Sequence, residues 1–117
     1  MSSSPSSPDF DLSTVTDATA HVVRVAGELD LGTGPRLEAL LNELPKPPNI
    51  VVLDFSALSF IDSTALRVLL AEHRRARAEG YEFVIAGAIG PVRELFRITA
   101  FDITLPLVPD VESATGG

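Results

Sequence analysis

The sequence predicts a single α/β domain whose sheet is mixed, mostly parallel and built from about five strands. Two apolar runs, at residues 49–55 and 82–86, are typical of strands in the middle of a covered sheet. Helical patterns separate these runs, and single helices between strands favour parallel pairing through right-handed crossovers. An N-terminal β-hairpin pattern adds an antiparallel edge. With 117 residues, the chain has room for one hydrophobic core and not for two.

The first half of the chain contains a tail, the hairpin and a helix. Residues 1–11 form a Ser/Pro-rich stretch that we expect to be disordered, so the folded domain should begin at residue 12. Strands are predicted at 12–16 and 21–26, with a turn between them. A helix is predicted at 33–44, because Pro35 suits its first turn and four leucines share one face.

The second half alternates strands and helices. Leu58, Phe60 and Ile61 are expected to anchor a loop that leads into the longest helix. Gly80 ends that helix. The domain should close at residue 112, and 113–117 should be a flexible tail. The predicted elements are a strand at 49–55, a helix at 63–79, a strand at 82–86, a helix at 91–99 and a strand at 103–108.

Composition and charge exclude several functional classes. The net charge is −7 and no basic stripe is present, so we do not expect binding to the negative phosphates of nucleic acid. The absence of cysteine excludes thiol catalysis, disulfides and cysteine-bound metals. No apolar run reaches the roughly 18–20 residues of a membrane span, and the N-terminus lacks the features of a signal peptide. We therefore expect a cytoplasmic protein without membrane insertion.

Catalytic chemistry is not expected either. A nucleophilic Ser63 would need a base, but His73 lies on the same predicted helix, about 15 Å away at 1.5 Å per residue. His73 is read instead as a partly buried packing residue, and His21 has no predicted neighbour. The chain has no G-x-S-x-G elbow, no phosphate-binding loop and no metal-ligand cluster. The sequence thus predicts no enzyme, no cofactor and no metal.

One alternative places chemistry on Asp54, at the end of the strand 49–55. A receiver-like protein is phosphorylated on an aspartate at such a position. That chemistry also needs an acidic pair after the first strand to hold magnesium. Asp17 and Asp30 do not form such a pair, so this stays a weak alternative.

Three polar residues, Asp62, Ser63 and Thr64, open the longest predicted helix. One interpretation is structural, since all three residue types accept hydrogen bonds from the free amides of a first helical turn. The other is regulatory. A phosphate on an exposed Ser63 would add roughly −1.5 to −2 charges, which a helix start tolerates and a docked partner does not.

At this point a resemblance becomes specific. The stretch 51–70, VVLDFSALSFIDSTALRVLL, resembles the signature of the STAS domains of bacterial anti-sigma factor antagonists, in which D-[LF]-S is followed by D-S-[ST]-G-L. The segment 27–30, GELD, is similar to that family's G-E-L-D segment. The stretches 80–87 and 92–96 resemble its fourth strand and third helix. The similarity covers nearly the whole domain.

The resemblance implies a STAS-type fold and an anti-sigma factor antagonist. In that family the unphosphorylated domain binds an anti-sigma factor that is itself a serine kinase, which releases the sigma factor. The kinase then phosphorylates the antagonist, and a PP2C-type phosphatase resets it. Ser63 matches the phosphorylated serine, with Thr64 as the alternative. The partner-binding residues implied are Asp30, Asp62, Ser63, Thr64, Ala65, Leu66 and Arg67.

One residue departs from the family pattern. Ala65 stands where the family usually has glycine, which is harmless to the backbone at negative φ but puts the contact with a partner in question. Arg67 lies one turn from Ser63, where it is placed to pair with a phosphate or an acidic partner residue. The other charged residues of the helix are expected on its solvated face: Glu72, Arg74, Arg75, Arg77 and Glu79.

A STAS module in another system, such as a stressosome scaffold or a lipid-transport complex, remains an alternative to the anti-sigma factor antagonist.

Overall fold

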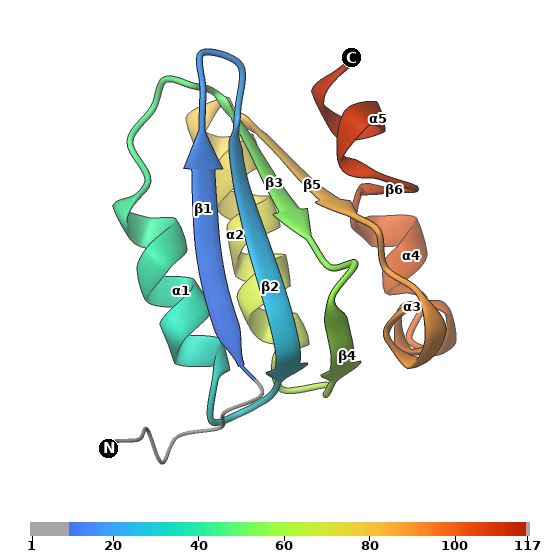
Figure 1. The fold of residues 1–117 in the computed structure, drawn as a ribbon. Helices are drawn as coiled ribbons and strands as arrows, with labels where there is room; N and C mark the ends of the chain where they lie inside the picture. Colours follow the sequence, from blue (N-terminus) through green and yellow to red (C-terminus); the bar gives the residue numbers. More distant parts are fainter. Residues whose placement is uncertain (1–9, 117) are drawn as a thin grey trace, which may run out of the picture.

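The computed structural model describes residues 10–116, and a six-stranded sheet forms its centre (Figure 1). The order is β1-β2-β3-β5-β6, with β4 beside β2. β1 pairs antiparallel with β2, and the other pairs are parallel. This confirms the predicted mixed α/β sheet, with one strand more than expected. The strands are β1 (Asp11–Thr16), β2 (His21–Leu29), β3 (Ile50–Asp54), β4 (Leu58–Ile61), β5 (Glu82–Ala86) and β6 (Leu107–Val108).

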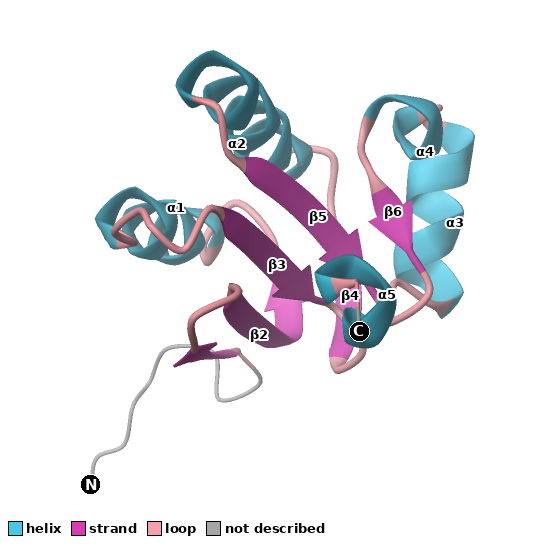
Figure 2. Cartoon of the chain, turned by 90° about the horizontal axis from the view of Figure 1, so that it is seen from above, coloured by secondary structure: helices cyan, strands magenta, loops and turns pink. Residues whose placement is uncertain are grey.

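Helices cover both faces of this sheet (Figure 2). Two long helices, α1 and α2, lie side by side on one face, and the short C-terminal α5 packs on the other. The helices are α1 (Gly34–Glu43), α2 (Leu66–Glu79), α3 (Gly90–Ile98), α4 (Phe101–Thr104) and α5 (Val111–Thr115). Within residues 10–116, none of them has the length and apolarity to cross a membrane.

The central strand β3 is buried on both sides, which accounts for its purely aliphatic run. Val51 and Leu53 belong to the main core beneath α1 and α2. Val52 points to the opposite face, where Val111 and Ala114 of α5 pack against it. A polar residue at any of these three strand positions would lose its contact with water without a partner.

Residues 58–61, expected as an anchored loop, instead form β4. Leu58 and Ile61 are buried, and the strand pairs in parallel with the second half of β2. The register of this pairing shifts between Gly27, opposite Leu58, and Glu28, opposite Phe60, so that Ser59 is the extra residue on β4. Gly27 has a φ of +95°, which suits glycine, and its N–H donates to the carbonyl of Ala57 at 3.1 Å. The strand predicted at 21–26 therefore continues through Gly27 to Leu29.

The C-terminal region also differs from the prediction. The strand expected at 103–108 is reduced to β6, because α4 continues to Thr104 and Pro106 cannot donate a ladder hydrogen bond. The residues beyond 112, expected as a tail, extend α5 to Thr115. Asp110 caps that helix by accepting from the N–H of Ser113 at 2.8 Å.

At the N-terminus, most of the expected tail 1–11 lies outside the described residues. Its last two residues do not: Asp11 begins β1, and Phe10 is 5% exposed and packs in the core. The guanidinium of Arg36 lies 4.9 Å from the centre of the Phe10 ring. The described fold therefore begins just before residue 12.

Glu72, expected on the solvated face of α2, is buried, with 4% of its surface exposed. The hydroxyl of Tyr81 donates to its carboxylate at 2.5 Å and accepts from Nε of Arg75 at 3.0 Å. Burial raises the pKa of Glu72 above its usual 4.5, opposed by the hydrogen bond from Tyr81 and the charge of Arg75. Burial, together with the bond to Glu72, raises the pKa of Tyr81 to about 12. Periodicity alone did not distinguish a paired buried carboxylate from an exposed one.

This network predicts the titration of Tyr81, the single tyrosine in a chain without tryptophan. Ultraviolet absorbance should give a midpoint near 12 in the folded protein, against an ordinary 10.0. Because the folded state holds this proton more tightly, the stability that it adds is complete below pH 10.0 and is lost as the pH rises toward 12. Glu72→Gln should lower the midpoint by removing the negative acceptor. The control, Glu112→Gln on α5, should leave it unchanged, and a midpoint near 10.0 in folded wild type would contradict the network.

Candidate functional site

Two aspartates end neighbouring strands on the same edge of the sheet. Leu29 of β2 and Ile61 of β4 are partners in the parallel register, so the residues that follow them, Asp30 and Asp62, leave the sheet together. The N–H of Asp62 donates to the carbonyl of Leu29 at 3.2 Å and links the two turns. The starts of α1 and α2 are therefore held side by side.

Asp62 organises the turn that precedes α2. Its Oδ1 accepts from the N–H of Ala65 at 2.8 Å. This turn occupies residues 63–65, so α2 begins at Leu66 and not at Ser63 as predicted. Ser63 is exposed, and its side chain makes no hydrogen bond to any residue within 10–116. Asp62 thus supplies the side-chain acceptor of this turn, and the Ser63 hydroxyl makes no hydrogen bond to the described residues.

Asp30 organises the turn before α1 in the same manner. Its Oδ1 accepts from the N–H groups of Gly32 at 2.9 Å and of Thr33 at 3.1 Å. Thr33 is buried, and its hydroxyl donates to the carbonyl of Glu28 at 2.8 Å and accepts from the N–H of Asp30 at 2.9 Å. Asp30, implied by the resemblance as a partner contact, also has this local structural role.

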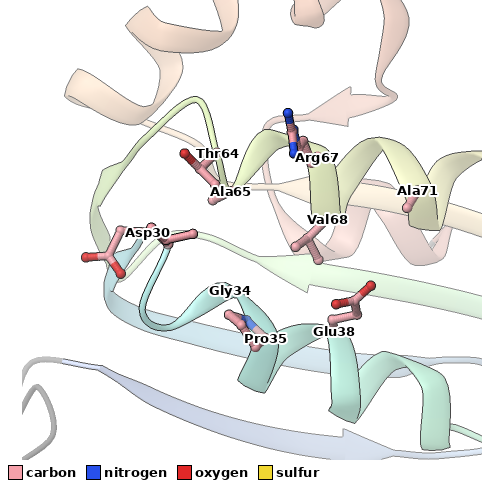
Figure 3. Close-up of a pocket in the computed structure, with 10 residues that line it drawn as sticks. Asp30, Gly34, Pro35, Glu38, Thr64, Ala65, Arg67, Val68 and Ala71 are labelled. Atoms are coloured by element: carbon pink, nitrogen blue, oxygen red, sulfur yellow. The ribbon is translucent and has the colours of Figure 1, made fainter.

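A groove of about 360 Å³ runs between α1 and α2 and reaches the turn before α2 (Figure 3). Val68 points from α2 toward α1, and Glu38 extends from α1 toward α2. The helices approach closely at one end, where a methyl group added to Gly34 would lie 3.5 Å from Val68 Cγ2. The lining residues are Asp30, Leu31, Gly34, Pro35, Glu38, Thr64, Ala65, Arg67, Val68 and Ala71.

Several of the residues implied by the resemblance gather at this groove. Asp30, Thr64, Ala65 and Arg67 line it. Asp62, Ser63 and Leu66 do not line it, and Leu66 is 2% exposed and packs in the core.

Ala65, which replaces the usual glycine, has φ −66° and is 1% exposed. A negative φ does not require glycine, so the methyl group is accommodated without backbone strain. Its burial also leaves almost no surface to crowd a partner.

The α1 side of the groove was missed from the sequence. Leu31, Pro35 and Glu38 contribute to it, and Leu31 is 70% exposed. A signal was present: an aspartate opens each of the two turns, and the residue three positions later, Thr33 or Ala65, donates its N–H back to that aspartate. Because β2 and β4 pair in parallel, these two similar turns lie next to each other, and so do the helices that follow them.

The other candidates lie elsewhere. Asp54 ends β3 and accepts from the N–H of Ser56 at 3.0 Å, in a separate hollow that Asp110 and Glu112 also line. His73 is half-buried on α2, as predicted. His21 is buried, with its ring nitrogens bonded to the Thr16 hydroxyl and to a backbone carbonyl. In the part of the chain that the structure describes, no three acidic or histidine side chains group as a metal site.

Comparison with known proteins places these features in a family. Residues 11–114 match the sequence profile described as STAS domain. The anti-sigma-B factor antagonist of Listeria monocytogenes is 30% identical over 101 residues, covering 85% of this chain and 88% of its own. The anti-sigma-F factor antagonist RsfB of Mycobacterium tuberculosis is 28% identical over 114 residues, covering 96% and 93%. The crystal structure of an anti-sigma factor antagonist from Mycobacterium paratuberculosis has a TM-score of 0.77 at 30% identity, covering 93% and 94%.

The hydrogen bond of Asp62 predicts that two neighbouring substitutions lower stability by different amounts. Asp62→Ala removes the acceptor for the N–H of Ala65 and should lower the free energy of unfolding by about 0.5–2 kcal/mol. Ser63→Ala removes an exposed hydroxyl and should change it by less than about 0.5 kcal/mol. Urea denaturation measures both, with Asp62→Asn as the control that keeps an acceptor. A larger loss from Ser63→Ala than from Asp62→Ala would show that Ser63 is the cap.

Proposed function

The chain belongs to the STAS domain family, and from this premise we propose that it is an anti-sigma factor antagonist switched off by phosphorylation of Ser63. Unphosphorylated, it binds an anti-sigma factor that is a serine kinase and so releases a sigma factor. That kinase transfers the γ-phosphate of ATP to the Ser63 hydroxyl, and a PP2C-type phosphatase removes it. ATP and magnesium belong to the kinase.

The observation that carries this proposal is the free, exposed hydroxyl of Ser63 beside a groove. A kinase needs its acceptor hydroxyl to be accessible, and the Ser63 hydroxyl is exposed. Its modification would break no hydrogen bond among residues 10–116, because it makes none there. Thr64 is half-buried and lines the groove, which supports Ser63 as the acceptor.

Electrostatics supports a switch that acts on docking and leaves the fold intact. A phosphate on Ser63 adds roughly −1.5 to −2 charges beside the carboxylate of Asp62. Inside the domain, the start of α2 offsets this charge by about 0.3–1 kcal/mol. A partner seated on the same surface would have to desolvate the charge, which costs several kcal/mol per ion. The charge therefore opposes binding far more than folding.

The first test uses phosphorylation. Anti-sigma factor kinases from the source organism are purified and incubated singly with the chain and ATP. One of them should place acid-stable phosphate on wild type and on Thr64→Ala, and none on Ser63→Ala. Acid-labile phosphate lost with Asp54→Asn would favour the receiver-like alternative. No phosphate from any kinase would favour the scaffold or transport module.

A second test measures binding of the kinase that modifies Ser63. Ser63→Asp should fold normally, because aspartate is accepted at a helix start, and should weaken binding at least tenfold. Ser63→Ala should bind as tightly as wild type and stay bound in the presence of ATP. Binding of Ser63→Asp at the wild-type affinity would contradict the charge switch. Loss of binding in folded Ser63→Ala would make Ser63 a contact residue.

A further inference from the structure

We propose that the α1–α2 groove is a second part of the docking surface and takes an apolar side chain from an amphipathic segment of the partner. That segment carries a basic residue on the side that faces α1. The inference rests on the proposed function, because the partner is the anti-sigma factor of that proposal. It adds an attractive contact, on residues of α1 and of the middle of α2, to the charge switch at Ser63.

Hydrogen bonds at both ends of the groove fix α1 and α2 relative to each other. At the sheet edge, the linked turns of Asp30 and Asp62 fix the two helix starts. At the far end, the guanidinium of Arg75 on α2 donates to the carbonyl of Leu41 at 2.9 Å and to Oδ1 of Asn42 at 2.5 Å. A partner therefore meets a formed groove, and less of its binding energy is lost to ordering.

The groove presents apolar surface that the fold does not use. Leu31 lies at its α1 side with 70% of its surface exposed, although the adjoining core is closely packed. Pro35, Val68 and Ala71 continue the apolar lining. Removing such surface from water is worth about 25 cal/mol per Å², so an apolar side chain seated here would anchor the partner.

Charge decides which segment fits. Glu38 extends over the groove from α1, and Arg67 stands on the α2 side. Neither takes part in a salt bridge with any residue of 10–116, where the pairs are Arg75–Glu72 and Arg97–Glu94. An occupant with a basic residue toward α1 and an acidic residue toward α2 would pair with both. The net charge of −7 favours approach of a partner with a basic surface.

The groove and the phosphorylation site form one continuous surface. Thr64 and Ala65 line the groove and directly follow Ser63 in the turn. An occupant of the groove thus lies next to any phosphate on Ser63. A phosphate on Ser63 would therefore weaken binding in the groove directly, without any change in the fold.

The test compares matched variants for binding to the kinase that phosphorylates Ser63. Ala71→Trp fills the groove, whereas Ala78→Trp places the same bulk on an exposed position of α2 outside it. Leu31→Ser removes the exposed anchor, and its control Ile103→Ser removes an apolar side chain of α4 that is 85% exposed. Each groove variant should weaken binding about tenfold or more, and each control less than about twofold.

A charge pair tests the occupant's chemistry. Glu38→Lys should weaken binding about tenfold or more, while Glu43→Lys, exposed at the end of α1, makes the same change in net charge and should have little effect. Circular dichroism checks that all variants are folded. Equal effects of Glu38→Lys and Glu43→Lys would contradict the inference that the bound segment carries a basic residue facing α1.

The outcomes separate this inference from the function beneath it. If Ser63→Asp abolishes binding while Ala71→Trp and Leu31→Ser bind like wild type, the groove inference fails and the proposed function stands. If no anti-sigma factor kinase binds wild type, both fail. Weakening by Ala78→Trp and Ile103→Ser as strong as by the groove variants would also overturn the inference, because the effect would not depend on the groove.

Discussion

The parallel pairing of β4 with the end of β2 is the constraint on which the site depends. β2 pairs with β3 along its first half, from His21 to Arg24, and with β4 along its last part, from Gly27 to Leu29. That arrangement brings Asp30 and Asp62 to one edge and sets α1 beside α2. Because the turns that lead into the two helices follow paired strand ends, the groove lies between those helices.

In the turn before α2, Asp62 and Ser63 differ in what they contribute to the fold. Asp62 accepts the hydrogen bond from the N–H of Ala65, whereas the hydroxyl of Ser63 makes no hydrogen bond among residues 10–116. A modified serine that also capped the helix would exchange stability for regulation each time it was phosphorylated. The hydrogen bond and the proposed phosphorylation fall on adjacent residues, so a phosphate on Ser63 would change its charge without breaking the hydrogen bond of Asp62.

The sequence predicted most of the sheet, and the resemblance named four of the ten residues that line the groove. Apolar runs located β3 and β5 because a strand buried on both faces leaves a continuous signal. β4 was missed because only two of its four residues are buried and its short pairing with β2 contains a register shift. The α1 side of the groove was missed for a related reason: Leu31 is apolar and exposed, and no local pattern separates such a residue from a core one.

Ser63 is proposed as a site from a local motif, whereas the groove is visible only in the folded structure. A helix start is a local event, written in consecutive residues, so Asp62 and Ser63 stand out in one dimension. A groove between two helices depends on Arg75 reaching α1 and on β4 pairing with β2, both contacts between distant residues. In the proposed docking, specificity would arise from such non-local geometry, because a partner that meets Ser63 would also have to fit the space beside it. The groove is therefore where related antagonists with the same phosphorylation motif should differ.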